Sequence, residues 1–216
     1  MNFNFNNFAT NSQGNNSNRG GQSYRGNQTL NLKKNDILDL SKVAPSLKNV
    51  VLGAGWQIAR TGPSFDLDIS AFLLNNRGVV ERVPDDVIFF NHQAAPGIHS
   101  EGDNLVGGSG STDDERIDIS LDKLDQRIQK IVFIVTIFEA DIKRQTFGMV
   151  NNSYVRLLDQ DNGDKEICRF DLKDKFSTET GVVFAELSKD ARNNWSFRAI
   201  GEGFIGDLNT IIQRYI

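Results

Sequence analysis

The chain has 216 residues, of which 24 are basic and 28 acidic, and its formal net charge is −4. This length suits one domain with a substantial core, and an apolar share of 38% is at the lean end of the globular range. The longest apolar run, Ile131 to Phe138, is too short to span a membrane, and the N-terminus does not have the composition of a secretory signal. The single cysteine, Cys168, excludes an internal disulfide. We therefore expect a cytoplasmic protein with at most peripheral membrane association.

Acidic side chains are concentrated in the middle of the chain. Residues 61–120 contain eleven acids and three arginines, so this stretch carries a charge of −8 and the rest of the chain carries +4. Such a surface disfavours nucleic acid as a partner and favours a cation. Three of these acids, Glu81, Asp85 and Asp86, belong to no motif that we can assign.

The first 28 residues differ in composition from the rest of the chain. They contain nine asparagines and four glycines but no Leu, Ile, Val or acidic residue. Such a segment buries too little apolar surface to offset the entropy of ordering. We therefore expect a disordered head over residues 1–28, which could support self-association through its aromatic residues, followed by one domain over residues 30–216.

From Leu30 onward, short runs rich in β-branched and aromatic residues alternate with turn residues, a pattern typical of strands. This number of strands with little helical periodicity predicts an all-β-dominated fold, a β-sandwich of two antiparallel sheets, or a barrel, with a few short peripheral helices. The expected strands are Val50–Leu52, Leu67–Leu74, Val87–Phe90, Ile117–Leu121, Ile131–Phe138, Tyr154–Leu158, Ile167–Phe170, Val182–Leu187 and Trp195–Ile200.

Two helices are expected, one from Asp141 to about Phe147 and one over Leu208–Tyr215, where apolar residues recur at helical spacing. The stretch from Asp159 to Asp164 begins like an EF-hand loop but has Phe170 where the bidentate Glu should stand, so we interpret it as a hairpin turn.

The first candidate site is the strand that begins at Phe65-Asp66-Leu67-Asp68. Strand alternation places Asp66, Asp68 and Ser70 on one face and the apolar residues on the other. Two carboxylates at this spacing repel each other unless a cation lies between them, and calcium accepts six to eight oxygens in loose geometry. The alternative is a strand whose acids simply face water.

The second candidate is a glycine-rich loop bracketed by acids, which runs from Glu101 to Glu115. It contains Asp103, Asn104, Asp113, Asp114 and Glu115, and its glycines would let backbone carbonyls turn toward an ion. The alternative is a flexible acidic hairpin loop without a ligand. Together the two motifs predict a calcium site with one or two ions.

Evidence for catalysis is thin. His92 and His99 are the only histidines, both are expected in a loop, and their spacing fits no standard zinc site. Cys168 lies inside an expected strand and is interpreted as a small buried hydrophobe. Acid pairs such as Asp66 with Asp68 could in principle serve as acid and base, but we expect that the protein is not an enzyme.

Ordered motifs from Leu30 to Ile216 resemble the TerD family, the tellurium-resistance or bacterial stress proteins. The matching segments are Pro45–Val50, Gly55-Trp56, Phe65–Leu74, Gly102–Asn104, Asp113–Glu115, Val135–Ile137, Arg144–Val150, Ser177–Thr180, Glu186-Leu187 and Trp195–Gly203.

This resemblance implies a β-sandwich that binds calcium through acidic loops, acts in resistance to tellurite and other stresses, and catalyses no known reaction. It implies related stress-operon proteins or self-association as partners. The matching acidic positions are Asp66, Asp68, Asp103, Asn104, Asp114 and Glu115, with Asp113 as a secondary ligand.

Three departures from the family pattern each remove or lengthen a carboxylate. They are Trp56-Gln57, Ser111-Thr112 and Phe138-Glu139, which stand in place of Trp-Asp, Gly-Asp and His-Asp. If the family carries two ions per domain, these changes predict that one site is weakened or absent. An alternative function is a scaffold without a metal site, which self-associates through the Asn-rich head.

Overall fold

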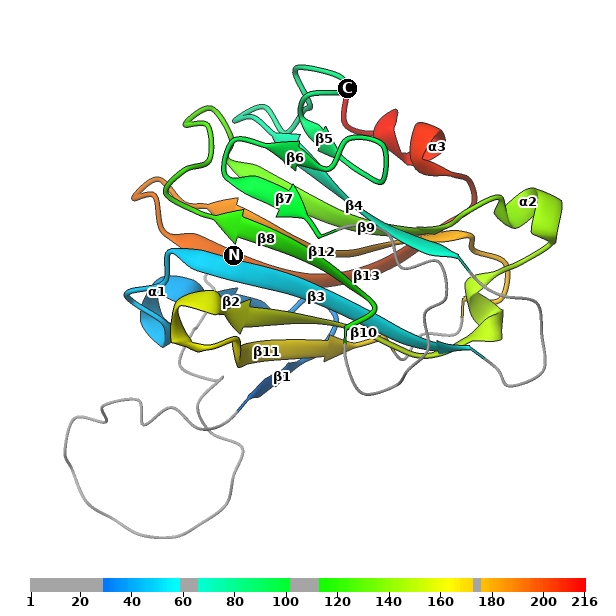
Figure 1. Cartoon of the computed structure of the whole chain (residues 1–216), viewed down its shortest axis with the longest axis horizontal. Helices are drawn as coiled ribbons and strands as arrows, with labels where there is room; N and C mark the ends of the chain where they lie inside the picture. Colours follow the sequence, from blue (N-terminus) through cyan, green and yellow to red (C-terminus); the bar gives the residue numbers. More distant parts are fainter. Residues whose placement is uncertain (1–28, 59–65, 102–112, 173–175) are drawn as a thin grey trace, which may run out of the picture.

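In the part of the chain that the structure describes, two β-sheets pack face to face in a sandwich, with three short α-helices at its periphery (Figure 1). The computed structural model describes residues 29–58, 66–101, 113–172 and 176–216. The expected head, residues 1–28, lies outside these residues. All strand pairs are antiparallel except the first strand, which runs parallel to its neighbour. The β-sandwich prediction is confirmed.

The first sheet has seven strands in the order β1-β11-β10-β3-β8-β7-β6. Their bounds are β1 (Leu30–Leu32), β11 (Lys165–Asp171), β10 (Val150–Asp159), β3 (Asn49–Ile58), β8 (Glu115–Ser120), β7 (Ile98–Ser100) and β6 (Ala94–Ala95).

The second sheet has six strands in the order β2-β13-β12-β9-β4-β5. Their bounds are β2 (Ile37–Asp39), β13 (Trp195–Phe204), β12 (Gly181–Lys189), β9 (Lys130–Ile137), β4 (Leu67–Leu74) and β5 (Val87–Ile88). The helical elements are α1 (Leu40–Val43), α2 (Ala140–Lys143), η2 (Phe147–Met149), η3 (Gln160–Asn162) and α3 (Leu208–Ile212).

The main core lies between the sheets, because alternate residues of each strand face inward. In β4 the inward residues are Leu67, Ile69, Ala71 and Leu73, as the strand pattern predicts. The outward face of β4 is buried as well. Phe72 and Leu74 belong to a second cluster that is covered by α3, while Asp68 and Ser70 lie farther along the same face. This burial on both faces explains the long apolar run of the strand.

The structure differs from the expected helix over residues 141–147. The helix α2 stops at Lys143 because Arg144 adopts the left-handed conformation with φ 51°, and Gln145 N then donates to Ala140 O. This is a Schellman-type ending, and it directs Phe147 into the core. His99, expected in a loop, belongs to β7, whereas the hairpin predicted at 159–164 is present between β10 and β11.

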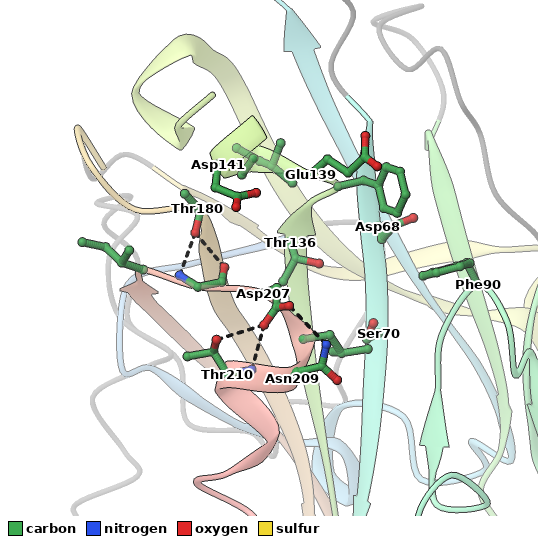
Figure 2. Close-up of a pocket in the computed structure, with 16 residues that line it drawn as sticks. Asp68, Ser70, Phe90, Thr136, Glu139, Asp141, Thr180, Asp207, Asn209 and Thr210 are labelled. Atoms are coloured by element: carbon green, nitrogen blue, oxygen red, sulfur yellow. Dashed lines mark hydrogen bonds between the residues drawn. The ribbon is translucent and has the colours of Figure 1, made fainter. Parts of the chain in front are cut away.

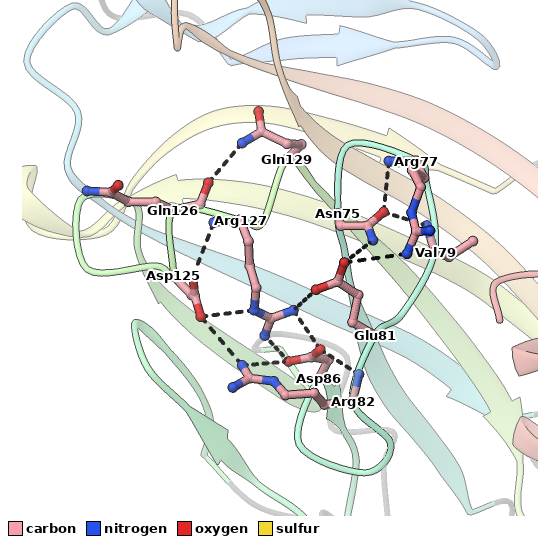
Figure 3. Close-up of polar contacts among 10 residues, drawn as sticks. All are labelled: Asn75, Arg77, Val79, Glu81, Arg82, Asp86, Asp125, Gln126, Arg127 and Gln129. Carbon is pink, nitrogen blue, oxygen red and sulfur yellow. Dashed lines mark hydrogen bonds and ion pairs between the residues drawn. The ribbon is translucent and has the colours of Figure 1, made fainter.

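A buried ion-pair network explains two of the acids left unassigned by the sequence. The side chain of Asp86 is 1% exposed and receives two hydrogen bonds from Arg127 and two from Arg82 (Figure 3). Glu81 pairs with Arg127 at 3.5 Å and accepts from Asn75. The network joins the β4–β5 connection to the segment before β9, so these acids have a structural role.

In the described parts of the chain, no helix reaches the length and apolarity that a membrane crossing requires.

Candidate functional site

The acidic residues expected to bind calcium come from two strands in different sheets. Asp66 directly precedes β4 and Asp68 lies within it, while Asp113, Asp114 and Glu115 lie at the start of β8. Asp103 and Asn104 belong to the segment 102–112, outside the described residues.

The start of β4 around Ile69, which we call the β4 edge, contacts β8 of the other sheet. β5 pairs with β4 only at Ala71 and Phe72, so it does not cover the backbone of Ile69. Glu115 reaches across from β8, and its Oε2 accepts a hydrogen bond from Ile69 N at 2.7 Å. This buried bond places the Glu115 carboxylate against the chain immediately after Asp68.

Asp114 is fixed in a similar way at the neighbouring strand. Its Oδ2 accepts from Trp56 N at 2.8 Å, and its own backbone N–H donates to Ala54 O. Asp114 and Glu115 are both buried and each uses one oxygen on a backbone donor. Backbone donors of this kind hold a carboxylate in one orientation.

Asp113 has a different set of contacts. Its carboxylate receives two hydrogen bonds from Arg156, at 2.7 and 3.0 Å, and one from the Tyr154 hydroxyl at 3.1 Å. A Cβ added to Gly53 would lie 2.2 Å from Asp113 Oδ2, so the absence of a side chain at Gly53 gives this carboxylate its room. The positive charge of Arg156 therefore compensates the negative charge of Asp113 within the first sheet.

This pairing changes the titration of its neighbours. Burial, the charge of Asp113 and the hydrogen bond to it raise the pKa of Tyr154 to about 12. Burial alone would lower the pKa of Arg156, but hydrogen bonds to Asp113 and Glu166 raise it above its ordinary value. Tyr154 therefore stays protonated and Arg156 stays charged across the physiological pH range.

The donor set at the β4 edge consists of hard oxygen ligands, which suit calcium and do not suit a thiolate-preferring metal. Within the described ranges no group of three or more His, Cys, Asp or Glu side chains is placed to hold a metal ion.

Asp68 and Ser70 also open into a cavity of about 560 Å³ on the outer face of the second sheet (Figure 2). Its other polar lining residues come from the end of β9, from α2 and the residue before it, from the residue before β12, and from the start of α3. They are Thr136, Glu139, Asp141, Thr180, Asp207, Asn209 and Thr210.

Most of the residues that line this cavity were not predicted from the sequence. Thr136 offered one signal, since it is the one polar residue within the apolar run Ile131–Phe138. Asp207 offered another, because an Asp just before a helix is a typical N-cap and its Oδ1 accepts from Thr210 N. Neither signal indicates that the two residues face one cavity.

The predicted burial of Cys168 is confirmed. Its side chain is fully buried, and burial raises the pKa of the thiol to about 12. His92 Nδ1 lies 2.9 Å from the backbone oxygen of Val87, a local contact next to β5.

Comparison with known proteins gives a consistent result. The model of the TerD domain matches residues 29–215. The chain is 42% identical over 190 residues to "Tellurium resistance protein TerD" of Serratia marcescens, covering 87% of this chain and 97% of that protein. It is 39% identical over 192 residues to "General stress protein 16U" of Bacillus subtilis (strain 168), with the same shares of both chains covered.

Solved structures show the same sandwich. A homologue of telluride resistance protein (TerD) from Streptomyces coelicolor A3(2) superposes with a TM-score of 0.63 at 25% identity, covering 77% of this chain and 96% of that chain.

Proposed function

Because the chain belongs to the TerD family, we propose that it is a calcium-binding, non-enzymatic stress-response protein that acts in tellurite resistance through protein assembly. Relatives named for tellurium resistance and general stress support the physiological part of this proposal. The calcium part rests on one observation. Glu115, which is far from β4 in the sequence, is hydrogen-bonded to Ile69 N, immediately beside Asp68.

The proposed calcium ligands are the acids at the β4 edge together with two residues of segment 102–112. They are Asp66, Asp68, Asp103, Asn104, Asp114 and Glu115. Asp114 and Glu115 would present oxygens already oriented by Trp56 N and Ile69 N. Asp113, which is held by Arg156, would instead fix the start of β8. A bound ion would reduce the repulsion among these carboxylates.

The buried thiol supports a mode of action without redox chemistry at cysteine. A thiol with its pKa raised to about 12 has almost no thiolate at neutral pH, and thiolate is the reactive form. We propose that the protein contributes to resistance through association with related proteins or with itself.

Thermal unfolding of the full chain with calcium and with EDTA tests the calcium proposal. A ligand that binds only the native state at a hundredfold excess over its Kd stabilises it by about 2.7 kcal/mol. The variants Asp68→Asn and Glu115→Gln are expected to reduce the calcium-induced shift in Tm. Their amide oxygens can still accept hydrogen bonds, so their folds should persist in EDTA.

Asp171→Asn is a matched control, because Asp171 forms an ion pair with Arg169 on its own strand β11, which is not a neighbour of β4. It should retain the full calcium shift. Equal melting temperatures of the unaltered chain in calcium and EDTA would contradict calcium binding. In cells, the Asp68→Asn chain should protect less well against tellurite than the Asp171→Asn chain.

A further inference from the structure

The outer cavity of the second sheet has a floor of buried hydroxyl groups. Ser70 is 1% exposed and Thr136 is 6% exposed, and both line the cavity (Figure 2). No hydrogen bond of either hydroxyl to another described residue is present, and neither oxygen is among the fully buried polar atoms that lack a partner, so both hydroxyls open into the cavity. Hydroxyl groups on buried side chains normally find a partner, so two that open into one cavity indicate that a ligand or water completes them.

The wall of the cavity is acidic. Asp68, Glu139, Asp141 and Asp207 contribute carboxyl groups, and no Lys, Arg or His is among the described residues that line it. Asp207 already accepts hydrogen bonds from Asn209 and Thr210, but such bonds leave its negative charge in place. The cavity therefore selects a cation over an anion.

The rim is apolar and aromatic. Phe90 and Phe138 meet edge to face with their ring centroids 6.0 Å apart, and both are exposed. Ile205, which lines the cavity just before α3, is 67% exposed. The Lys143 ammonium lies 4.9 Å from the Phe138 centroid and 4.0 Å from Glu139 Oε2. Lys143 therefore already forms a cation–π contact with Phe138 and an ion pair with Glu139 at the rim.

The size of the cavity narrows the ligand class. A volume of about 560 Å³ lies within the range of small-molecule sites, roughly 300–1,000 Å³, and is far larger than one bare ion needs. Carboxylates and hydroxyls accept hydrogen bonds from an ammonium group, while the phenyl rings contact an aliphatic chain.

We propose that this cavity binds an organic cation, a primary ammonium group carried on a flexible aliphatic chain, as in a polyamine. The ammonium lies on the floor between Asp68, Ser70 and Thr136, and the aliphatic part passes between the apolar rim residues. Glu139 and Asp141 hold a second positive group at the wall. Asp68 belongs to both proposed sites, whereas Glu139 and Asp141 are not among the calcium ligands proposed above, so variants of these two acids test the cavity apart from the metal.

Isothermal titration of the full chain with spermidine tests the proposal, in EGTA and at about 0.15 M salt, where charges farther apart than about 8 Å are largely screened. We expect saturable binding with one spermidine per chain. The double variant Glu139→Gln/Asp141→Asn should raise the Kd at least tenfold. Thr136→Val keeps the shape of the side chain but removes the hydroxyl, and it should raise the Kd several-fold without lowering the Tm.

Two further variants distinguish the cavity from general charge attraction. Lys143→Gln removes a competing ammonium from the rim and should lower the Kd. Glu202→Gln removes an exposed acid that pairs with Arg214 outside the cavity, and it should leave the Kd unchanged. The neutral diol 1,8-octanediol, which is of comparable length, should not bind.

The absence of saturable binding would overturn the proposal, as would equal Kd values for the double variant and for Glu202→Gln. Loss of the calcium-induced Tm shift in the double variant would show that these acids serve the metal, which would also overturn it. Retention of that shift together with weakened spermidine binding supports the assignment of Glu139 and Asp141 to the organic cation rather than to the metal.

Discussion

At the scale of single residues, Asp113 matches the pattern of a calcium ligand, but its side chain instead forms an ion pair that stabilises the fold. Its side chain is 2% exposed and pairs with Arg156, which is 26% exposed. The sequence places Asp113 beside Asp114 and Glu115, and nothing local separates it from them. Only the register of β10 with β3, which sets Arg156 opposite Gly53, reveals its partner.

Substitution of Gly53 by Ala tests this arrangement. The added Cβ would lie 2.2 Å from Asp113 Oδ2, so we expect Gly53→Ala to lower the free energy of unfolding by about 1–3 kcal/mol through overpacking. In an Asp113→Ala background the clash disappears, and the same change should cost much less. Denaturant unfolding of the four proteins in this double-mutant cycle measures the coupling. Additive effects would contradict the contact.

Cys168 gives a second prediction at this scale. Because the thiol is fully buried and its pKa is raised to about 12, it should react with a disulfide reagent such as DTNB only as fast as the protein unfolds. Denaturant should accelerate the reaction in parallel with the loss of structure. Rapid stoichiometric labelling of the native protein at pH 8 would contradict this.

At the scale of elements, the Asp86 network determines how the loops at one end of β4 are held. Burial raises the pKa of Asp86, but hydrogen bonds from Arg127 and Arg82 outweigh burial and lower it below its ordinary value. A carboxyl group with a lowered folded-state pKa contributes stability above its unfolded pKa, about 3.9, and this contribution is lost as the pH falls through the folded value.

We therefore expect Asp86→Asn to destabilise the protein at pH 7 and to flatten the fall of stability below about pH 4. Asp86→Ala should cost about 3 kcal/mol at pH 7, because it removes one partner of a buried ion pair. Glu202→Gln, in an exposed pair with Arg214, should change stability by less than about 1 kcal/mol. Urea unfolding from pH 3 to pH 7 measures all three, and identical pH profiles for Asp86→Asn and the unaltered chain would contradict the pKa shift.

The end of α2 gives another prediction for an element. Arg144 is in the left-handed conformation, which glycine adopts without the steric cost that other residues meet. Arg144→Gly should therefore raise the free energy of unfolding by up to about 1 kcal/mol, whereas Arg144→Val should lower it. A lower Tm for Arg144→Gly than for Arg144→Val would show that the Arg144 side chain, rather than its backbone, stabilises this turn.

At the scale of the whole molecule, β1 is the first described strand of the sandwich. Leu30, Asn31 and Leu32 pair with β11, and Leu30 and Leu32 pack on the core. Removal of residues 1–28 should therefore leave the Tm and the calcium-induced shift unchanged, within about 2 °C for a cost below 0.5 kcal/mol. If the head drives assembly, light scattering should show smaller particles for the shortened chain. A large fall in Tm would place residues 1–28 within the folded domain.

Local patterns allowed much of the fold to be predicted, because strand alternation and turn residues depend on neighbours in the sequence. The alternation of apolar and polar residues in β13 is one example: Trp195, Phe197 and Ala199 face the core. Predictions were weakest at α2, which ends early at the left-handed Arg144, and for the short strands β6 and β7 near one edge of the first sheet.

The sequence alone therefore determined the fold class, the family and the concentration of acids between residues 61 and 120. The tertiary structure decided which partner each of those acids has. Asp86 joins Arg127, Asp113 joins Arg156, and Glu115 binds the backbone of β4. Each partner lies more than 40 positions away in the chain, so it is chosen by sheet order and register and leaves no local signature. For the same reason, the floor and wall of the outer cavity become visible only when β4, β9, α2 and α3 are brought together.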